Sequence, residues 1–161
     1  MLRLLVALVA CTLVGAPLRA QTTPADSLLH AARADAHEAA RDPFVGGYFA
    51  TGFLGGATLG FVAPIAVVSP NKEAVAIAGL GGALVFATLD QAGQPVRTLP
   101  DSIRWRVADQ PTEYQEAFRA AYAQRLTRRR VRAAKNGGIV GTLAGAGFFG
   151  FLVYSFTQAD F

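Results

Sequence analysis

Two long runs without a charged side chain constrain the fold of this chain more than any other feature. Residues 44–68 carry no charge over 25 positions, and residues 136–159 carry none over 24. The hydrocarbon core of a bilayer is roughly 30 Å thick, and a helix of about 20 apolar residues crosses it. We therefore expect an all-α membrane protein with transmembrane helices over 44–68 and 136–159.

Each of these runs carries glycines at every fourth position. Three glycines in each run share the spacing: Gly52, Gly56 and Gly60, then Gly137, Gly141 and Gly145. Residues four apart lie on one face of a helix, and small residues there let two backbones approach closely in lipid. We expect these six glycines to form helix-packing faces, with Gly56 and Gly141 as the central contacts.

A third uncharged stretch, residues 74–89, is only 16 residues long. At 1.5 Å per residue a helix of this length reaches about 24 Å, which is less than the bilayer core. We expect a short apolar or re-entrant helix over 74–89, so that the chain crosses the membrane twice. A chain with three spans is the alternative.

The first 20 residues have the pattern of a Sec signal peptide. A basic start at Arg3 precedes an apolar stretch, and Ala20 offers a cleavage site before Gln21. An uncleaved anchor is one alternative. Lipoprotein processing is another, because Leu8 to Cys11 resembles a lipobox. Cys11 is the only cysteine in the sequence, so cleavage after Ala20 leaves a mature chain without thiol chemistry.

Polar segments fill the rest of the chain. Residues 21–43 predict an acidic N-terminal helix, capped by Asp26 or Ser27 and stopped by Pro43. Residues 90–111 form a polar linker that contains three prolines. Residues 112–135 predict a basic amphipathic helix that begins with a capping box at Thr112 and Gln115.

The basic helix has two distinct parts. Tyr114, Phe118 and Tyr122 share one face near its start. Six basic residues crowd its end, directly before the last apolar run: Arg125, Arg128, Arg129, Arg130, Arg132 and Lys135. Basic residues beside a span favour the cytoplasmic side and contact anionic lipid headgroups. We interpret the cluster as a lipid-headgroup contact or topology determinant, which places residues 69–135 in the cytoplasm, and not as a nucleic-acid site.

Recognisable patterns for catalysis, cofactors or metals are missing from the sequence. His30 and His37 share a helix face, but a metal site needs three or four ligands in fixed geometry. The glycine runs lack the spacing of a phosphate-binding loop. The apolar runs also lack the ionisable group that is usual in transporters. We expect no enzymatic activity, no cofactor and no metal.

The glycine spacing resembles that of glycine-zipper membrane proteins, and the layout is similar to that of small exported bacterial proteins. The resemblance implies a bacterial cell envelope and no known activity. We expect a non-enzymatic protein of the inner membrane that packs or oligomerises through its glycine faces, with lipid and a second copy or another membrane protein as partners. The alternatives are a small oligomeric pore and a membrane-surface or partner-binding module through residues 112–135. A C-terminal Phe161 leaves the outer membrane as an alternative location.

Overall fold

The computed structural model describes residues 23–41, 45–69 and 71–159, which form helices and no strands. The five helices are α2 (Pro24–Ala39), α3 (Val45–Val68), α4 (Lys72–Gly93), α5 (Asp101–Val107) and α6 (Thr112–Ala159). The expected all-α fold is therefore confirmed for this part of the chain. The predicted signal peptide over 1–20, with Cys11, lies outside the described residues.

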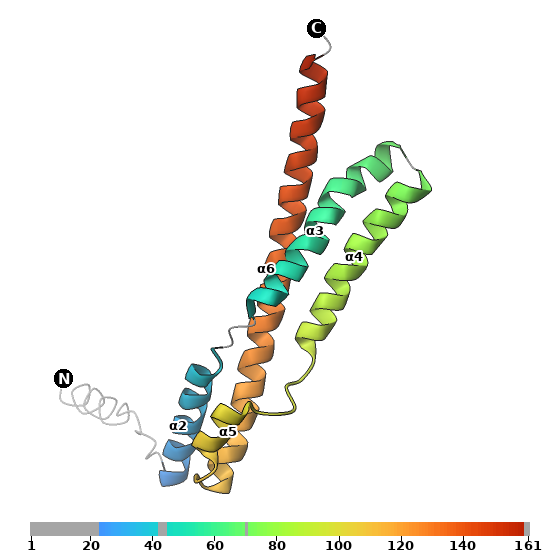
Figure 1. The fold of residues 1–161 in the computed structure, drawn as a ribbon. Helices are drawn as coiled ribbons and strands as arrows, with labels where there is room; N and C mark the ends of the chain where they lie inside the picture. Colours follow the sequence, from blue (N-terminus) through green and yellow to red (C-terminus); the bar gives the residue numbers. More distant parts are fainter. Residues whose placement is uncertain (1–22, 42–44, 70, 160–161) are drawn as a thin grey trace, which may run out of the picture.

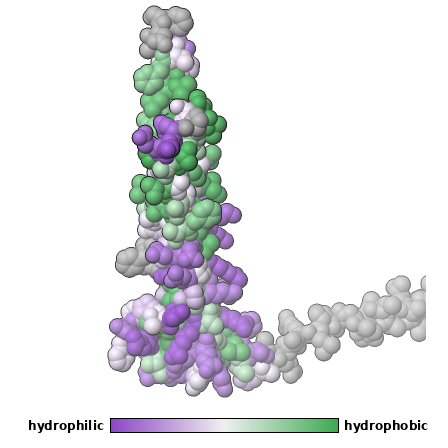
Figure 2. Space-filling view, turned by 90° about the vertical axis from the view of Figure 1, so that its right-hand side faces the viewer, coloured by the Kyte–Doolittle hydropathy of each residue, from purple (hydrophilic) through white to green (hydrophobic). Residues whose placement is uncertain are grey.

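The helices form a slender apolar column that stands on a polar head (Figure 1). The column consists of α3, α4 and the second half of α6, while α2, α5 and the first half of α6 make the head. Hydrophobic residues cover most of the column, apart from a small hydrophilic patch near its far end, and hydrophilic ones gather over the head and at its junction with the column (Figure 2). Within the described residues, three helices are long and apolar enough to cross a membrane: α3, α4 and α6.

The structure thus gives three candidate spans where the sequence predicts two. The helix expected over 74–89 extends to 22 residues because charged residues join both of its ends. Asn71 caps it by accepting a hydrogen bond from the backbone N–H of Ala74 at 2.6 Å, and Asp90 lies inside its last turns. At 1.5 Å per residue α4 reaches about 33 Å, enough for the bilayer core.

Helices α3 and α6 run in the same direction. Gly52 on α3 lies against Ala134 on α6, and Gly60 lies against Thr142, so residue numbers rise together along the contact. Helix α4 runs the opposite way, because Gly81 contacts both Gly55 and Leu59 while Val85 contacts Gly55. Two spans joined by a cytoplasmic segment 69–135 would have to be antiparallel. That arrangement disagrees with the parallel pair: if α3 and α6 both cross a membrane, a third crossing between them is required, and α4 is the helix available for it.

The core of the head joins α2 to α6. Ala32 and Ala36 on one face of α2, and Ala40 at its C-cap, are fully buried in a cluster with Phe118 and Tyr122 of α6. The three aromatic rings that share a face of α6 are stacked, with centroids 6.3 Å and 6.2 Å apart. The small alanines leave room for these rings, so a helix with few large apolar residues can still pack closely against α6.

Three local features differ from the sequence prediction. Thr23 caps α2 through a capping box with Asp26, three residues before the expected start, and the helix ends at Ala39. The Gln115 side chain donates hydrogen bonds to the carbonyls of Ala108 and Gln110, in place of the expected capping box with Thr112. The polar linker over 90–111 contains α5, and α6 is one continuous helix of 48 residues.

Candidate functional site

The closest helix contact in the column is made by the glycine faces of α3 and α6. A Cβ atom built on any of the six predicted packing glycines would come nearer than 3.0 Å to a backbone oxygen of the other helix, a distance that real Cβ atoms essentially never show. The glycines are Gly52, Gly56, Gly60, Gly137, Gly141 and Gly145. All six therefore lie in one contact within the chain, where the two backbones touch directly.

The contact has a local two-fold character. Gly56 faces the carbonyl oxygen of Gly138, and Gly141 faces that of Phe53, so each helix offers a glycine and an oxygen to the other. The same exchange relates Gly60 and Thr142 to Gly145 and Ala57. In such a geometry the Hα that replaces a side chain points at a carbonyl oxygen, a weak but recurrent interaction between helices.

Paired glycines let α3 contact two helices at once. Gly56 faces α6, whereas its neighbour Gly55 faces α4, where a Cβ would meet Gly81 O and the Val85 side chain at 3.0 Å. Successive residues on a helix point about 100° apart, so a Gly-Gly pair opens two adjacent faces. Gly79, Gly82, Gly147 and Gly150 have nothing within 4 Å of a built Cβ. These four glycines remain on the outer surface of the column.

The basic cluster lies at the junction of head and column, where its members have different surroundings. Arg129 donates a hydrogen bond of 2.7 Å to the carbonyl of Ala40, at the C-terminal end of α2. The guanidinium of Arg130 lies over the ring of Tyr48 on α3, 5.5 Å from its centroid. These two arginines join the basic half of α6 to both neighbouring helices. Lys135 is exposed.

Four arginines of the cluster line one side of a groove between α6 and the start of α3. We call it the arginine groove; it has a volume of about 470 Å³ and is lined by Val45, Gly46, Phe49, Arg125, Arg128, Arg129, Arg132, Ala133 and Asn136. The arginines recur at i, i+3, i+4 and i+7, so they share one face of α6. The opposite side, formed by α3, is apolar. The groove thus combines a cationic wall with an apolar wall.

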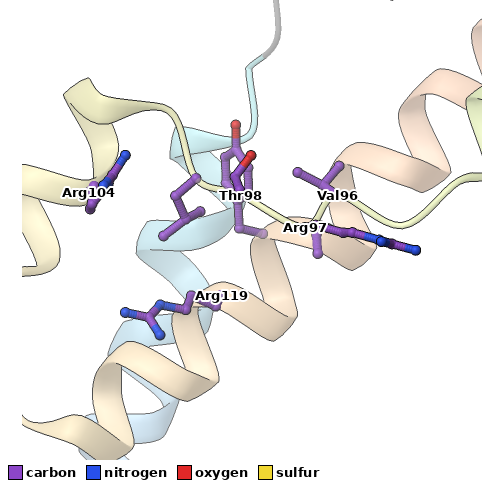
Figure 3. A pocket seen from close by; sticks show the side chains of 8 residues that line it. Val96, Arg97, Thr98, Arg104 and Arg119 are labelled. Carbon is purple, nitrogen blue, oxygen red and sulfur yellow. The ribbon is translucent and has the colours of Figure 1, made fainter.

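A second hollow, in the head, also contains arginines, but they do not converge. It has a volume of about 250 Å³. Arg104 pairs with Asp101, and Arg119 donates to Gln115. Arg97 points away from both of them (Figure 3). The positive charge of this hollow is therefore dispersed or neutralised, and it offers a weaker anion site than the arginine groove.

The histidines of α2 and the pair Tyr114 and Asp35 are further titratable candidates for site residues in the head. Among the described residues no group of three or more His, Cys, Asp or Glu could hold a metal ion, and both His30 and His37 are exposed on α2. Tyr114 donates a hydrogen bond to Asp35 and so ties α6 to α2. Burial, followed by this hydrogen bond to the carboxylate, raises the pKa of Tyr114 to about 12.

Comparison with known proteins adds no assignment. No protein family matches this chain, and neither a curated protein nor a solved structure matches it. The site must therefore be interpreted from its own geometry.

Sequence reasoning missed the α3 side of the arginine groove. Val45, Gly46 and Phe49 lie more than 75 positions from the arginines they face, and no local pattern links the two segments. The pairing of Arg130 with Tyr48 was missed for the same reason. One signal was available: both segments directly adjoin a glycine face, and two packed glycine faces bring their flanking residues together.

Proposed function

We propose that this chain is a non-enzymatic integral membrane protein with three spans, which anchors a basic helical head at one surface of a bacterial inner membrane. The surface of the column carries this proposal. Of the large apolar side chains that are exposed in the described residues, all except Trp105 lie on α3, α4 or the second half of α6. Water-soluble monomers rarely expose apolar surface on this scale, whereas a lipid-facing surface requires it.

The packing within the chain narrows the ways in which copies could assemble. The predicted glycine faces of α3 and α6 cover each other, so they are not free to bind a second copy. Any homo-oligomer would use the outer surface of the column. The direct backbone contact also leaves no lumen between α3 and α6, which favours an anchor over a pore within one chain.

The three-span arrangement places α2, α5 and the basic half of α6 on one side of the membrane. The signal-peptide pattern over 1–20 predicts that this side is exported, because α2 would follow the cleavage site. The arginine cluster predicts the cytoplasmic side. Because α2 packs on α6, the head can lie on only one side of the membrane, so the two expectations cannot both be correct. Labelling from each side of the membrane decides between the exported and the cytoplasmic side.

Alkaline carbonate extraction of membranes from cells that express the full chain tests the proposal. Carbonate releases peripheral proteins, so the protein should stay in the pellet and dissolve only in detergent. Release by carbonate would contradict membrane insertion. Dye leakage from liposomes that contain the protein tests the pore alternative, and we expect tight vesicles at high protein load.

A further inference from the structure

We infer that the arginine groove binds an anionic phospholipid, with the headgroup phosphate at the arginines of α6 and an acyl chain along the apolar wall of α3. The inference rests on the proposed membrane insertion and identifies a ligand for the junction of head and column.

Charge is the first argument. Four guanidinium groups line the groove, and no carboxylate from the described residues lines it or pairs with Arg125, Arg128 or Arg132. Arg129 is fixed at one end by its bond to Ala40, while Arg128 and Arg132 are exposed. Guanidinium donors match phosphate oxygens in a bidentate geometry. A set of guanidinium groups that no described carboxylate neutralises favours an anionic ligand with phosphate oxygens.

The apolar wall distinguishes a lipid from a free phosphate ion. Phe49 is 39% exposed at the groove and stacks on Phe53 one turn further along α3, with ring centroids 6.4 Å apart. An acyl chain that lies over this wall gains van der Waals contacts with it, which is the kind of attraction that operates within lipid. Inorganic phosphate gains nothing there, so the two walls together fit an amphiphile.

The position of the groove along the column supports the same ligand. It lies where α3 begins and where α6 changes from Arg132 to the uncharged run that starts at Asn136. In a membrane-inserted chain this is the level of the headgroups, and basic pockets between spans at that level bind anionic lipids.

Native mass spectrometry of the full chain in phosphatidylcholine nanodiscs with a rising fraction of phosphatidylglycerol tests the inference. The wild type should retain phosphatidylglycerol in preference to phosphatidylcholine. The double variant Arg128→Gln and Arg132→Gln should need at least about tenfold more phosphatidylglycerol for half occupancy, at about 1 kcal/mol per basic residue. The charge-matched control, Arg97→Gln and Arg119→Gln, should change the phosphatidylglycerol needed for half occupancy by less than about threefold.

Three results would overturn the inference: no phosphatidylglycerol preference in the wild type, equal losses in the groove variant and the control, or saturable binding of inorganic phosphate in detergent that replaces lipid retention. Phe49→Ala is a second variant that leaves every charge in place, and it should also weaken retention. Failure of the wild type to enter nanodiscs would instead contradict membrane insertion itself, so the two proposals fail in different ways.

Discussion

The backbone oxygen of Phe53 lies where residue 141 would need to place a side chain. An ideal Cβ on Gly141 comes closer than 3.0 Å to that oxygen, and Gly56 meets the oxygen of Gly138 in the same manner. Even a methyl group at these positions therefore requires the two helix backbones to separate. The parallel contact between α3 and α6 depends on glycine at both positions.

Gly141→Ala should destabilise the column by about 1–3 kcal/mol, because overpacking a close contact forces the backbone to shift. Gly147→Ala is the matched control on the same helix, since its Cβ would meet nothing within 4 Å. Unfolding in mixed micelles with rising SDS measures both variants. Equal stability of the two variants would show that α3 and α6 do not pack as described.

The contact between α3 and α4 can be tested with two neighbouring glycines of α4, of which one lies in the contact and the other outside it. Gly81→Ala places a Cβ at 2.9 Å from the backbone nitrogen of Leu59, whereas Gly82→Ala places one in open space. We expect Gly81→Ala to cost about 1 kcal/mol or more and Gly82→Ala to cost nothing measurable. The same SDS titration compares them, and a greater loss for Gly82→Ala would contradict the position of α4.

Arg129→Gln should loosen α2 from α6. The substitution removes the charged hydrogen bond to the carbonyl of Ala40, a kind of interaction that contributes about 1.5–3 kcal/mol. Hydrogen exchange should become faster in α2 but stay unchanged in α3. Arg128→Gln is the control, because Arg128 is exposed in the groove and no bond from it to α2 is seen. If hydrogen exchange in α2 were equally fast in both variants, the bond from Arg129 to Ala40 would not be what holds α2 on α6.

The bond between Tyr114 and Asp35 gives the head a dependence on alkaline pH. Burial and the carboxylate raise the pKa of Tyr114 to about 12 in the folded chain, from an ordinary value of 10.0. Stability from this tyrosine is fully present below pH 10 and is lost as the pH rises through about 12. Asp35→Asn should lower the pKa of Tyr114. An absorbance titration of the tyrosines measures this pKa, and the variant Tyr114→Phe identifies which part of the signal comes from Tyr114. An unchanged pKa would contradict the bond.

Local patterns predicted much of the fold. The all-α class follows from the length of the uncharged runs, and the stacked face of Tyr114, Phe118 and Tyr122 follows from their four-residue spacing. The end of α4 was misjudged because counting uncharged residues stops at Asp90, whereas a helix tolerates charged residues at its ends. The boundaries of the long apolar helices were therefore less predictable than their existence.

The relative direction of α3 and α6 could not be predicted from the same patterns. A glycine face permits close approach in either orientation, so the spacing of Gly52 and Gly137 says nothing about whether their helices are parallel. Charge rules placed residues 69–135 on one side and thereby implied antiparallel helices. The packing of Gly60 on Thr142 and of α2 on α6 shows that tertiary contacts decide the arrangement.

Our main proposal is that the chain crosses the membrane three times with α3 and α6 parallel. It is tested most directly by finding the side of the membrane from which single cysteines are labelled. Cys11→Ser removes the only cysteine of the sequence, and Ser69→Cys, Thr127→Cys or Gln158→Cys then adds one in each chain. An impermeant maleimide is applied to intact and lysed cells. Three spans with parallel α3 and α6 predict that Ser69→Cys and Gln158→Cys label from the same side, opposite to Thr127→Cys. Labelling of Ser69→Cys together with Thr127→Cys, and opposite to Gln158→Cys, would contradict the three-span arrangement.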